Sequence, residues 1–582
     1  MRRSGPQKSA QVPWTSKVSA RIPASDAACA MFNAPLRRSI AHEFDWRQTI
    51  AARYRVPCRH VARAARSRTE SVLTDASPGG PLSIRTLRAA LTEGREPPPL
   101  PAIARLPSYR WFVVATVCIG ACMGQIDASM TQVLLPRLEV EFGARLSSVS
   151  WVAVAYLLAM ASFTPIFGRL ADMVGRKLLY LGGFFLFIVG SGLCGFATDL
   201  PMLIFFRILQ SIGAALLTSN SIAIIVMATG EEERGRGLGL QSAAQAVGLG
   251  AGPAVGGLIL DTLGWQWAFW INVPMGLAGV ILGWLLLPQT KALPATGRFD
   301  WYGALLIAPA LTAVVAALNE GHAWGFASPA LIGCAAFGIV FLALFVRTER
   351  RATSPLLDLH LLGRRAFLLG NAANFLAYAV LFGVFFLVPF ALVRIYDDSA
   401  LVAGLRLSIL PVMLGLLAPV GGMLYDRLGA RAPTSCGMLI CIASLATIYF
   451  FLDGSAANLP LVTLALALFG VGQGLFISPN TSAIMATAPP EQTGQAGSVL
   501  NLVRLIGMSA GIAGASTLFA VGLGDTGGST LNVPTSSLVA SCRGVILLLG
   551  GLAALAGLIS LIRPRGVAGR DAGAVHRSPI VE

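Results

Sequence analysis

The 582-residue chain has few charged residues: Asp, Glu, Lys and Arg make up 12% of it, while hydrophobic residues make up 55%. With a mean hydropathy of +0.69, it has too few charges to cover a soluble globular protein of this length. Its nine cysteines and five histidines show no paired C-x-x-C motif and no clustered ligand spacing. We therefore predict a polytopic membrane protein with neither a disulfide framework nor a metal site.

Motifs for catalysis and nucleotide binding are also missing. The chain has no G-x4-G-K-[ST] loop, no nucleophile elbow and no paired catalytic carboxylates, so we expect no ATP site, no cofactor and no enzymatic activity. No apolar core follows the first arginines, and a cleavable signal peptide is not expected. The net charge of +16 does not indicate nucleic-acid binding, because the arginines concentrate near the amino terminus and in alternate loops.

Fourteen apolar runs separated by polar joints fill the chain from residue 111 onward. The joints after even-numbered runs are rich in Arg and Lys, and short loops of that kind stay in the cytoplasm. We therefore expect a multi-pass protein of the cell inner membrane with both termini cytoplasmic. The predicted spans are about 111–132, 149–167, 178–197, 200–225, 238–260, 267–287, 301–318, 329–346, 366–390, 403–424, 434–451, 459–484, 496–519 and 543–562.

A short charged motif occurs twice, each time between two apolar runs. The copies contain Gly168, Asp172, Gly175 and Arg176, then, far downstream, Gly422, Asp426, Arg427 and Gly429. Such a repeat predicts two halves built on one plan, as in many secondary transporters. We interpret the motif as a conformational loop in which glycine permits a tight turn and Asp caps a helix. The alternative is an ordinary basic inner loop.

The offset of the repeat assigns runs one to six and nine to fourteen to equivalent six-helix bundles, with runs seven and eight as an inserted pair. The predicted parts are a disordered basic extension (1–107), the first bundle (108–288), the inserted pair (289–346), the second bundle (347–565) and a cytoplasmic tail (566–582). An arginine cluster in the extension leaves an alternative to a solvated tail, namely a basic amphipathic helix on anionic lipid.

Asp127 and Arg207 are charged residues inside apolar runs, where a charge costs about 2.5 to 3.5 kcal/mol on insertion scales and is usually functional. Asp127 shares a face of run one with Gly120 and Gly124 and is the leading proton or cation site. Arg207 cannot lose its proton, so we expect it to tune a protonatable carboxylate or to line the transport route. The alternatives are a hydrated or capping Asp127 near the outer interface and an Arg207 that snorkels to lipid phosphate.

Run five combines glycines at four-residue spacing with a proline: Gly248, Gly252, Pro253, Gly256 and Gly257. Such a set predicts a hinge or a sliding contact between the halves, or else simple tight packing. Polar residues on other helical faces are candidates for a substrate cavity or for interhelical hydrogen bonding. These residues are Gln210, Gln241, Gln245, Asn371, Asn374, Tyr378 and Arg504.

In these motifs the chain resembles the major facilitator superfamily, in particular its fourteen-span drug:proton antiporter branch. The resemblance covers residues 111–562, and its most specific element is the glycine and proline set at 248–257, which is similar to the antiporter signature. The segment 127–136 is similar to the span-one motif, and 207–213 resembles the span-four motif linked to proton coupling. In the segment 265–276, Gln266 replaces the arginine expected at the start of span six.

The resemblance implies alternating access, with proton entry driving the exit of amphiphilic or hydrophobic compounds, as in multidrug efflux. The implied partners are protons, a small-molecule substrate and the lipid bilayer, with an accessory periplasmic adaptor protein as a further candidate. Two alternatives are an exporter of one metabolite, such as an amino acid, sugar or siderophore, and a membrane receptor that has the carrier fold without transport.

Overall fold

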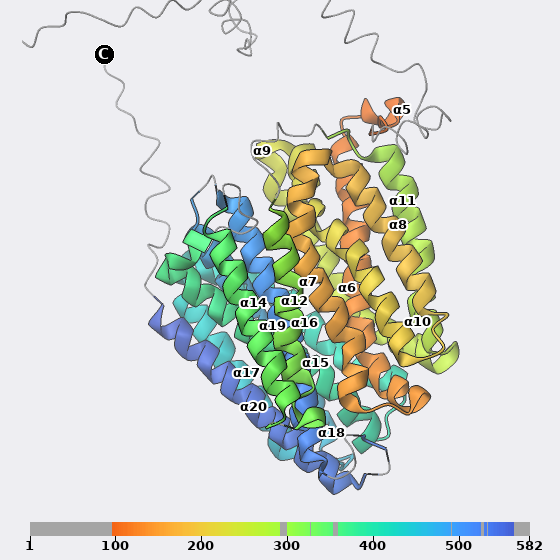
Figure 1. Ribbon diagram of the computed structural model, residues 1–582, viewed down its shortest axis with the longest axis vertical. Helices are drawn as coiled ribbons and strands as arrows, with labels where there is room; N and C mark the ends of the chain where they lie inside the picture. The colour runs from red at the N-terminus through yellow and green to blue at the C-terminus, as the bar shows by residue number, and fades with distance from the viewer. Residues whose placement is uncertain are drawn as a thin grey trace, which may run out of the picture. The chain divides into compact units, whose positions relative to one another are not determined.

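The computed structural model describes residues 96–290, 300–325, 327–352, 359–489, 492–524, 529–531 and 533–563. Fourteen helices in this part are long and apolar enough to cross a membrane, which confirms the predicted all-α membrane architecture (Figure 1). Residues 96–107, which we predicted to be disordered, instead contain the short helix α5 (Pro101–Ala104). The rest of the predicted extension and the predicted tail at 566–582 lie outside the described residues.

The first six spans form one bundle. They comprise α6 (Tyr109–Phe142), α7 (Leu146–Val174), α8 (Arg176–Cys194), α9 (Leu200–Thr262), α10 (Trp265–Trp270) and α11 (Asn272–Leu286). Helix α9 contains predicted runs four and five as two limbs, Leu200–Gly230 and Glu233–Thr262. Between them, Gly230 has φ of 70° and ψ of −175°, a conformation that glycine adopts at little cost, and there the chain changes direction.

The second bundle follows the inserted pair. The pair is α12 (Trp301–Asn319) and α14 (Pro329–Glu349), joined through α13 (Gly321–Trp324). A 3-10 turn, η1 (Leu359–Gly363), precedes the second bundle, which comprises α15 (Arg365–Ile395), α16 (Ala400–Leu428), α17 (Arg431–Phe451), α18 (Leu459–Ala486), α19 (Thr493–Gly522) and α20 (Thr535–Ile562). Helix α12, drawn in green, packs against α14 and also against α7 and α19 (Figure 1). The inserted pair therefore lies beside one of the seams between the bundles.

The same helix contact occurs in both bundles. A Cβ added to Gly248 on the second limb of α9 would lie 2.5 Å from the carbonyl oxygen of Cys122 on α6. A Cβ added to Gly507 on α19 would lie 2.6 Å from the carbonyl oxygen of Phe375 on α15. Backbones can approach this closely only through residues without side chains. The equivalent contacts support two bundles built on one plan.

The first copy of the charged motif is mostly helix, not loop. Helix α7 runs through Gly168 and Asp172, and a single glycine, Gly175 with φ of 112°, separates it from α8. The carboxylate of Asp172 does not cap α8; it forms an ion pair with the guanidinium of Arg176. The expectation of an Asp cap is therefore wrong, because Gly175 occupies the N-cap position.

The second copy of the motif is similar, with two residues between its helices. Helix α16 continues through Asp426 and Arg427, and Gly429, with φ of 73°, makes the turn into α17. The repeated charged motif thus marks a turn of one or two residues, with a positive-φ glycine, between two long helices. The predicted joints are too long, because the charged residues of the motif continue α7 and α16 as helix.

The segments on either side of the first bundle meet at the start of α8. Lys177 is fully buried, and its ammonium group donates hydrogen bonds to the carbonyls of Pro97 (2.8 Å) and Leu287 (2.6 Å). The carboxylate of Glu96 accepts hydrogen bonds from the backbone N–H of Lys177 (2.9 Å) and from the hydroxyl of Thr290 (2.5 Å). We call Glu96, Lys177 and Thr290 the N-terminal clamp. It ties the chain before α6 and the chain after α11 to the α7–α8 turn.

Candidate functional site

A buried ion pair lies within the first bundle. Asp127 on α6 is 0% exposed and Arg207 on the first limb of α9 is 1% exposed. The carboxylate Oδ2 of Asp127 lies 2.7 Å from Nη1 of Arg207. Because both side chains point into the protein, the structure rules out a hydrated or capping Asp127 and a snorkelling Arg207.

Neutral hydrogen-bonding groups complete the surroundings of the pair. Oδ1 of Asp127 accepts hydrogen bonds from the side-chain amides of Gln210 (2.8 Å) and Asn272 (2.9 Å). Arg207 donates from Nη1 to Oε1 of Gln210 (2.7 Å) and from Nε to the carbonyl of Val152 (3.1 Å). A buried ion pair is tolerated only when such additional bonds satisfy its remaining donors and acceptors.

The network extends to α8 and to the start of the sixth span. Nδ2 of Asn272 also donates to the hydroxyl of Ser191 (3.0 Å), which donates to the carbonyl of Phe269 (2.7 Å). In the sequence analysis, Asn272 appears only as part of the segment 265–276, and no role is assigned to Asn272 or to Ser191. A single Asn at the start of an apolar run was the only signal available. The described residues contain no group of His, Cys, Asp or Glu side chains placed to hold a metal ion.

A tyrosine separates the ion pair from a cavity. The centroid of the Tyr156 ring on α7 lies 4.1 Å from Cζ of Arg207, so the guanidinium stacks on the ring. Tyr156 is 2% exposed, and it also lines the cavity described next. A movement of Arg207 would therefore remove a contact from a ring that forms part of the cavity wall.

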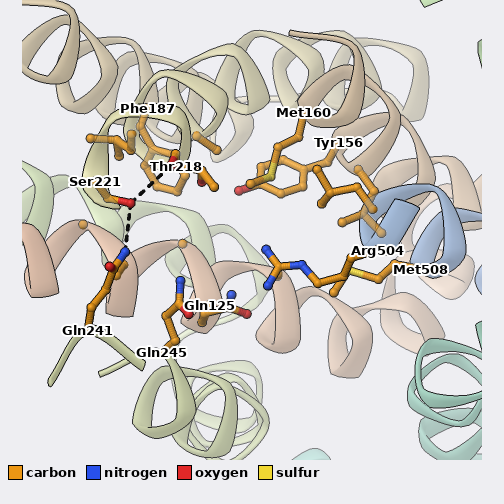
Figure 2. A pocket seen from close by; sticks show the side chains of 18 of the residues that line it. Gln125, Tyr156, Met160, Phe187, Thr218, Ser221, Gln241, Gln245, Arg504 and Met508 are labelled. Atoms are coloured by element: carbon orange, nitrogen blue, oxygen red, sulfur yellow. Dashed lines mark hydrogen bonds between the residues drawn. The ribbon is translucent and has the colours of Figure 1, made fainter. Parts of the chain in front are cut away.

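The cavity lies between the two bundles and has about 660 Å³ of space between atoms, part of it open solvent. Its lining comes from α6, α7, α8 and both limbs of α9 on one side and from α15 and α19 on the other (Figure 2). Of the seven predicted cavity residues, Gln241, Gln245 and Arg504 line it. The amide of Gln241 donates to the hydroxyl of Ser221 (2.8 Å), as the figure shows.

The other four predicted cavity residues lie elsewhere. Gln210 belongs to the Asp127 network, and Asn374 is fully buried on α15. The amide of Asn371 donates to the carbonyl one helical turn earlier (2.9 Å). Tyr378 is not among the lining residues, although its ring centroid lies 5.9 Å from Cζ of Arg504. Polar character on a helix did not by itself distinguish residues that face the cavity from residues that face a neighbouring helix.

The glycine and proline set of α9 makes contacts of two kinds. Gly248, Gly252 and Gly256 face α6 of the same bundle. Toward the other bundle, Gly257 lies against the backbone of Ala400, and Gly404 on α16 lies against the carbonyl of Pro253. One helix thus packs tightly inside its bundle and also forms a backbone contact between the bundles.

Hydrogen bonds join the two bundles at one end of the spans, where α6 and α9 end and α7 and α16 begin. We call this end the distal end. Glu139 on α6 accepts hydrogen bonds from the backbone N–H of Thr530 (2.6 Å) and from Nη2 of Arg394 (3.3 Å). Asp261 on α9 accepts from the backbone N–H of Leu401 (2.9 Å), at the N-terminus of α16. The bundles are therefore held together at the distal end.

Comparison with known proteins identifies the family of most of the chain. The family model described as Major Facilitator Superfamily matches residues 117–512. The chain is 34% identical to the riboflavin transporter RibZ of Clostridioides difficile, over 71% of this chain and 89% of that protein. It is 30% identical to a multidrug resistance protein B homolog of Mycobacterium tuberculosis (69% and 75% covered) and 29% identical to the tetracenomycin C resistance and export protein of Streptomyces glaucescens (71% and 77%).

Solved structures share the fold at low sequence identity. The nucleoside transporter NupG has a TM-score of 0.55 at 12% identity, with 78% of this chain and 99% of that chain covered. A bacterial homolog of the human lysosomal transporter Spinster also has a TM-score of 0.55, at 17% identity, with 78% and 98% covered. At such identities the likeness concerns the fold alone.

Proposed function

Because the chain belongs to the major facilitator superfamily of membrane transporters, we propose that it is a proton-coupled antiporter that exports amphiphilic or hydrophobic small molecules. The observation that carries this proposal is the buried Asp127–Arg207 pair, placed behind Tyr156 in the wall of the cavity. Relatives named for multidrug resistance and for tetracenomycin C export support the same class of substrate.

Protonation of Asp127 would change the balance of charge at the pair. In its charged form the carboxylate compensates Arg207; once protonated, it leaves a buried guanidinium without a counter-charge, at a cost of about 3 to 5 kcal/mol. The guanidinium is then expected to move toward another acceptor and to displace the Tyr156 ring stacked on it. Since Tyr156 lines the cavity, this movement links the proton to the shape of the substrate site.

The driving force is adequate for export. One elementary charge that crosses about 150 mV releases roughly 3.5 kcal/mol. At about 1.4 kcal/mol per decade, that energy sustains a substrate gradient of a few hundredfold. We place the protein in the cell inner membrane with both termini in the cytoplasm, so that the distal end faces outward and the structure corresponds to a state closed to the outside.

The test is proton-driven transport in proteoliposomes with an imposed pH gradient. The Asp127→Asn variant should lose gradient-driven accumulation of an amphiphilic dye, because its side chain cannot gain or lose a proton. Gln125→Ala, which changes a neighbouring residue of α6 that lines the cavity, should keep a dependence on the gradient. Gradient-driven transport by Asp127→Asn at the wild-type rate would remove Asp127 from the coupling mechanism.

A second candidate function is the export of one metabolite. The likeness to a protein named as a riboflavin transporter favours it, since that relative is 34% identical over most of both chains. A competition screen separates the two functions. Inhibition of transport by many unrelated amphiphiles supports a multidrug exporter, whereas inhibition by one compound and its close analogues supports a dedicated carrier.

A further inference from the structure

We propose that the cavity selects organic anions with a planar aromatic part, and that Arg504 binds the anionic group. This inference depends on the proposed function only in that the cavity between the bundles is taken as the substrate site. It adds the sign of the substrate's charge, which the fold and the comparisons do not assign. Four features of the described residues carry it.

The first feature is the charge of the lining. Among the described residues that line the cavity, Arg504 on α19 is the one with a full charge. Figure 2 shows its guanidinium reaching into the space between Tyr156 and Gln125. No described lining residue is an Asp or a Glu, so the wall offers no counter-charge to a cationic ligand.

The second feature is the state of the buried carboxylate. Asp127 lies near the lining residues of α6, but it is fully buried and its charge is compensated by Arg207. Tyr156 stands between that pair and the cavity. While the pair is intact, the net charge presented to a ligand is therefore that of Arg504.

The third feature is the incomplete set of partners around Arg504. Its Nη2 donates to Oδ1 of Asn501 at 2.5 Å, and its guanidinium lies 5.9 Å from the ring centroid of Tyr378. Both partners are neutral, and the buried Nε has no hydrogen-bond partner within the described part of the protein. A guanidinium keeps its charge at all accessible pH values and binds carboxylates, sulfonates and phosphates in a bidentate manner. An anion is the partner that suits the charge and geometry of this guanidinium.

The fourth feature is the shape of the remaining surface. Four aromatic rings from three helices line the cavity: Tyr156 on α7, Tyr180 and Phe187 on α8, and Phe382 on α15. The side chains of Gln125 and Gln245 also line the cavity, on the side of the guanidinium away from Tyr156 (Figure 2). Rings stack on planar ligands, and amides bond to ring carbonyls and ring N–H groups. The chemistry of the lining thus matches an aromatic plane that carries polar edge groups and one acidic substituent.

The test compares two xanthene dyes of similar size, fluorescein as the anion and a rhodamine ester as the cation. Their binding to the purified full-length protein is measured by fluorescence anisotropy, in detergent and without a proton gradient. The wild type should bind fluorescein at least tenfold more tightly than the rhodamine ester. Arg504→Gln should weaken fluorescein binding about tenfold or more, equivalent to about 1.4 kcal/mol, and should not weaken rhodamine binding.

Two further variants serve as controls. Arg504→Lys keeps the charge and should recover part of the fluorescein affinity. Arg543→Gln removes the same charge from α20, where Nε bonds to the carbonyl of Tyr449 outside the cavity, and should leave both dyes unaffected.

The inference is overturned if the wild type binds the cationic dye at least as tightly as the anionic one, if it binds neither, or if Arg504→Gln binds fluorescein normally. Because this assay needs no gradient, its outcome is independent of the Asp127→Asn transport test. If the dye assay contradicts the inference but transport is coupled to protons, the protein is an antiporter for other substrates. If the dye assay supports the inference but transport is not coupled to protons, the protein binds aromatic anions without antiport.

Discussion

At the scale of single residues, Asp127 and Arg207 depend on each other for stability. Each is almost fully buried, so replacement of one leaves a charge without a counter-charge. We expect Arg207→Gln to destabilise the protein by about 3 to 5 kcal/mol. The double variant Asp127→Asn with Arg207→Gln should regain much of that loss, because no isolated charge remains. Thermal unfolding of the detergent-solubilised protein, followed by tryptophan fluorescence, measures both effects.

The double variant also separates structural from functional roles. It should remain unable to couple transport to a pH gradient, even where its stability approaches that of the wild type. If the two single losses simply add in the double variant, the residues do not interact energetically and the ion pair has no structural role.

The sequence indicated the charged residues of this site but not the neutral residues around them. Asp127 and Arg207 were identifiable because a charge in an apolar run is rare. Asn272, Ser191 and Tyr156 are ordinary residues in spans six, three and two, and only the packing of those helices brings them to the pair. The pairing itself joins residues eighty positions apart, which helical periodicity within one run cannot predict.

At the scale of helices, the N-terminal clamp stabilises the α7–α8 turn. Glu96 accepts hydrogen bonds from α8 and from the chain after α11, so Glu96→Ala removes several bonds to partly buried donors. We expect a loss of about 1 to 3 kcal/mol, measured as a lower midpoint of thermal unfolding. Glu141→Ala is the matched control: its ion pair with Arg137 is long (3.4 Å) and exposed, and its loss should cost less than about 0.5 kcal/mol. Equal midpoints for the two variants would contradict a stabilising clamp.

Helices were easier to predict than the turns between them. The fourteen apolar runs were visible because each must satisfy its backbone within the membrane. The turns were placed wrongly where polar residues continue a helix beyond the apolar run, as at Asp172 and Asp426. Glu96 gave no signal, because one carboxylate in a Pro-rich segment resembles any exposed residue.

At the scale of the whole molecule, the two bundles meet through α7 with α19 and through α9 with α16. The α9–α16 seam includes backbone contacts at Gly257 and Gly404 and the Asp261 bond to the start of α16. Alternating access requires such contacts to break and form again as the bundles rock. A substitution that disturbs the seam only in the closed state should therefore shift the balance between states without disrupting either bundle.

Gly257→Ala is such a substitution. Its Cβ would overlap the backbone of Ala400, whereas a Cβ at Gly239 on the same limb of α9 would meet nothing within 4 Å. Overpacking costs about 1 to 3 kcal/mol, and because that cost falls on the distally closed state, the ratio of open to closed molecules should rise about 5- to 150-fold.

The distance between the distal ends of the two bundles measures this ratio. Spin labels are attached in a cysteine-free background at Val140 and Phe450, two exposed positions near the distal ends of α6 and α17. Double electron–electron resonance should show a larger population of long spin-label distances in Gly257→Ala. The distance distribution of Gly239→Ala should equal that of the wild type. If both variants keep the wild-type distribution, the α9–α16 contact does not hold the distal end closed.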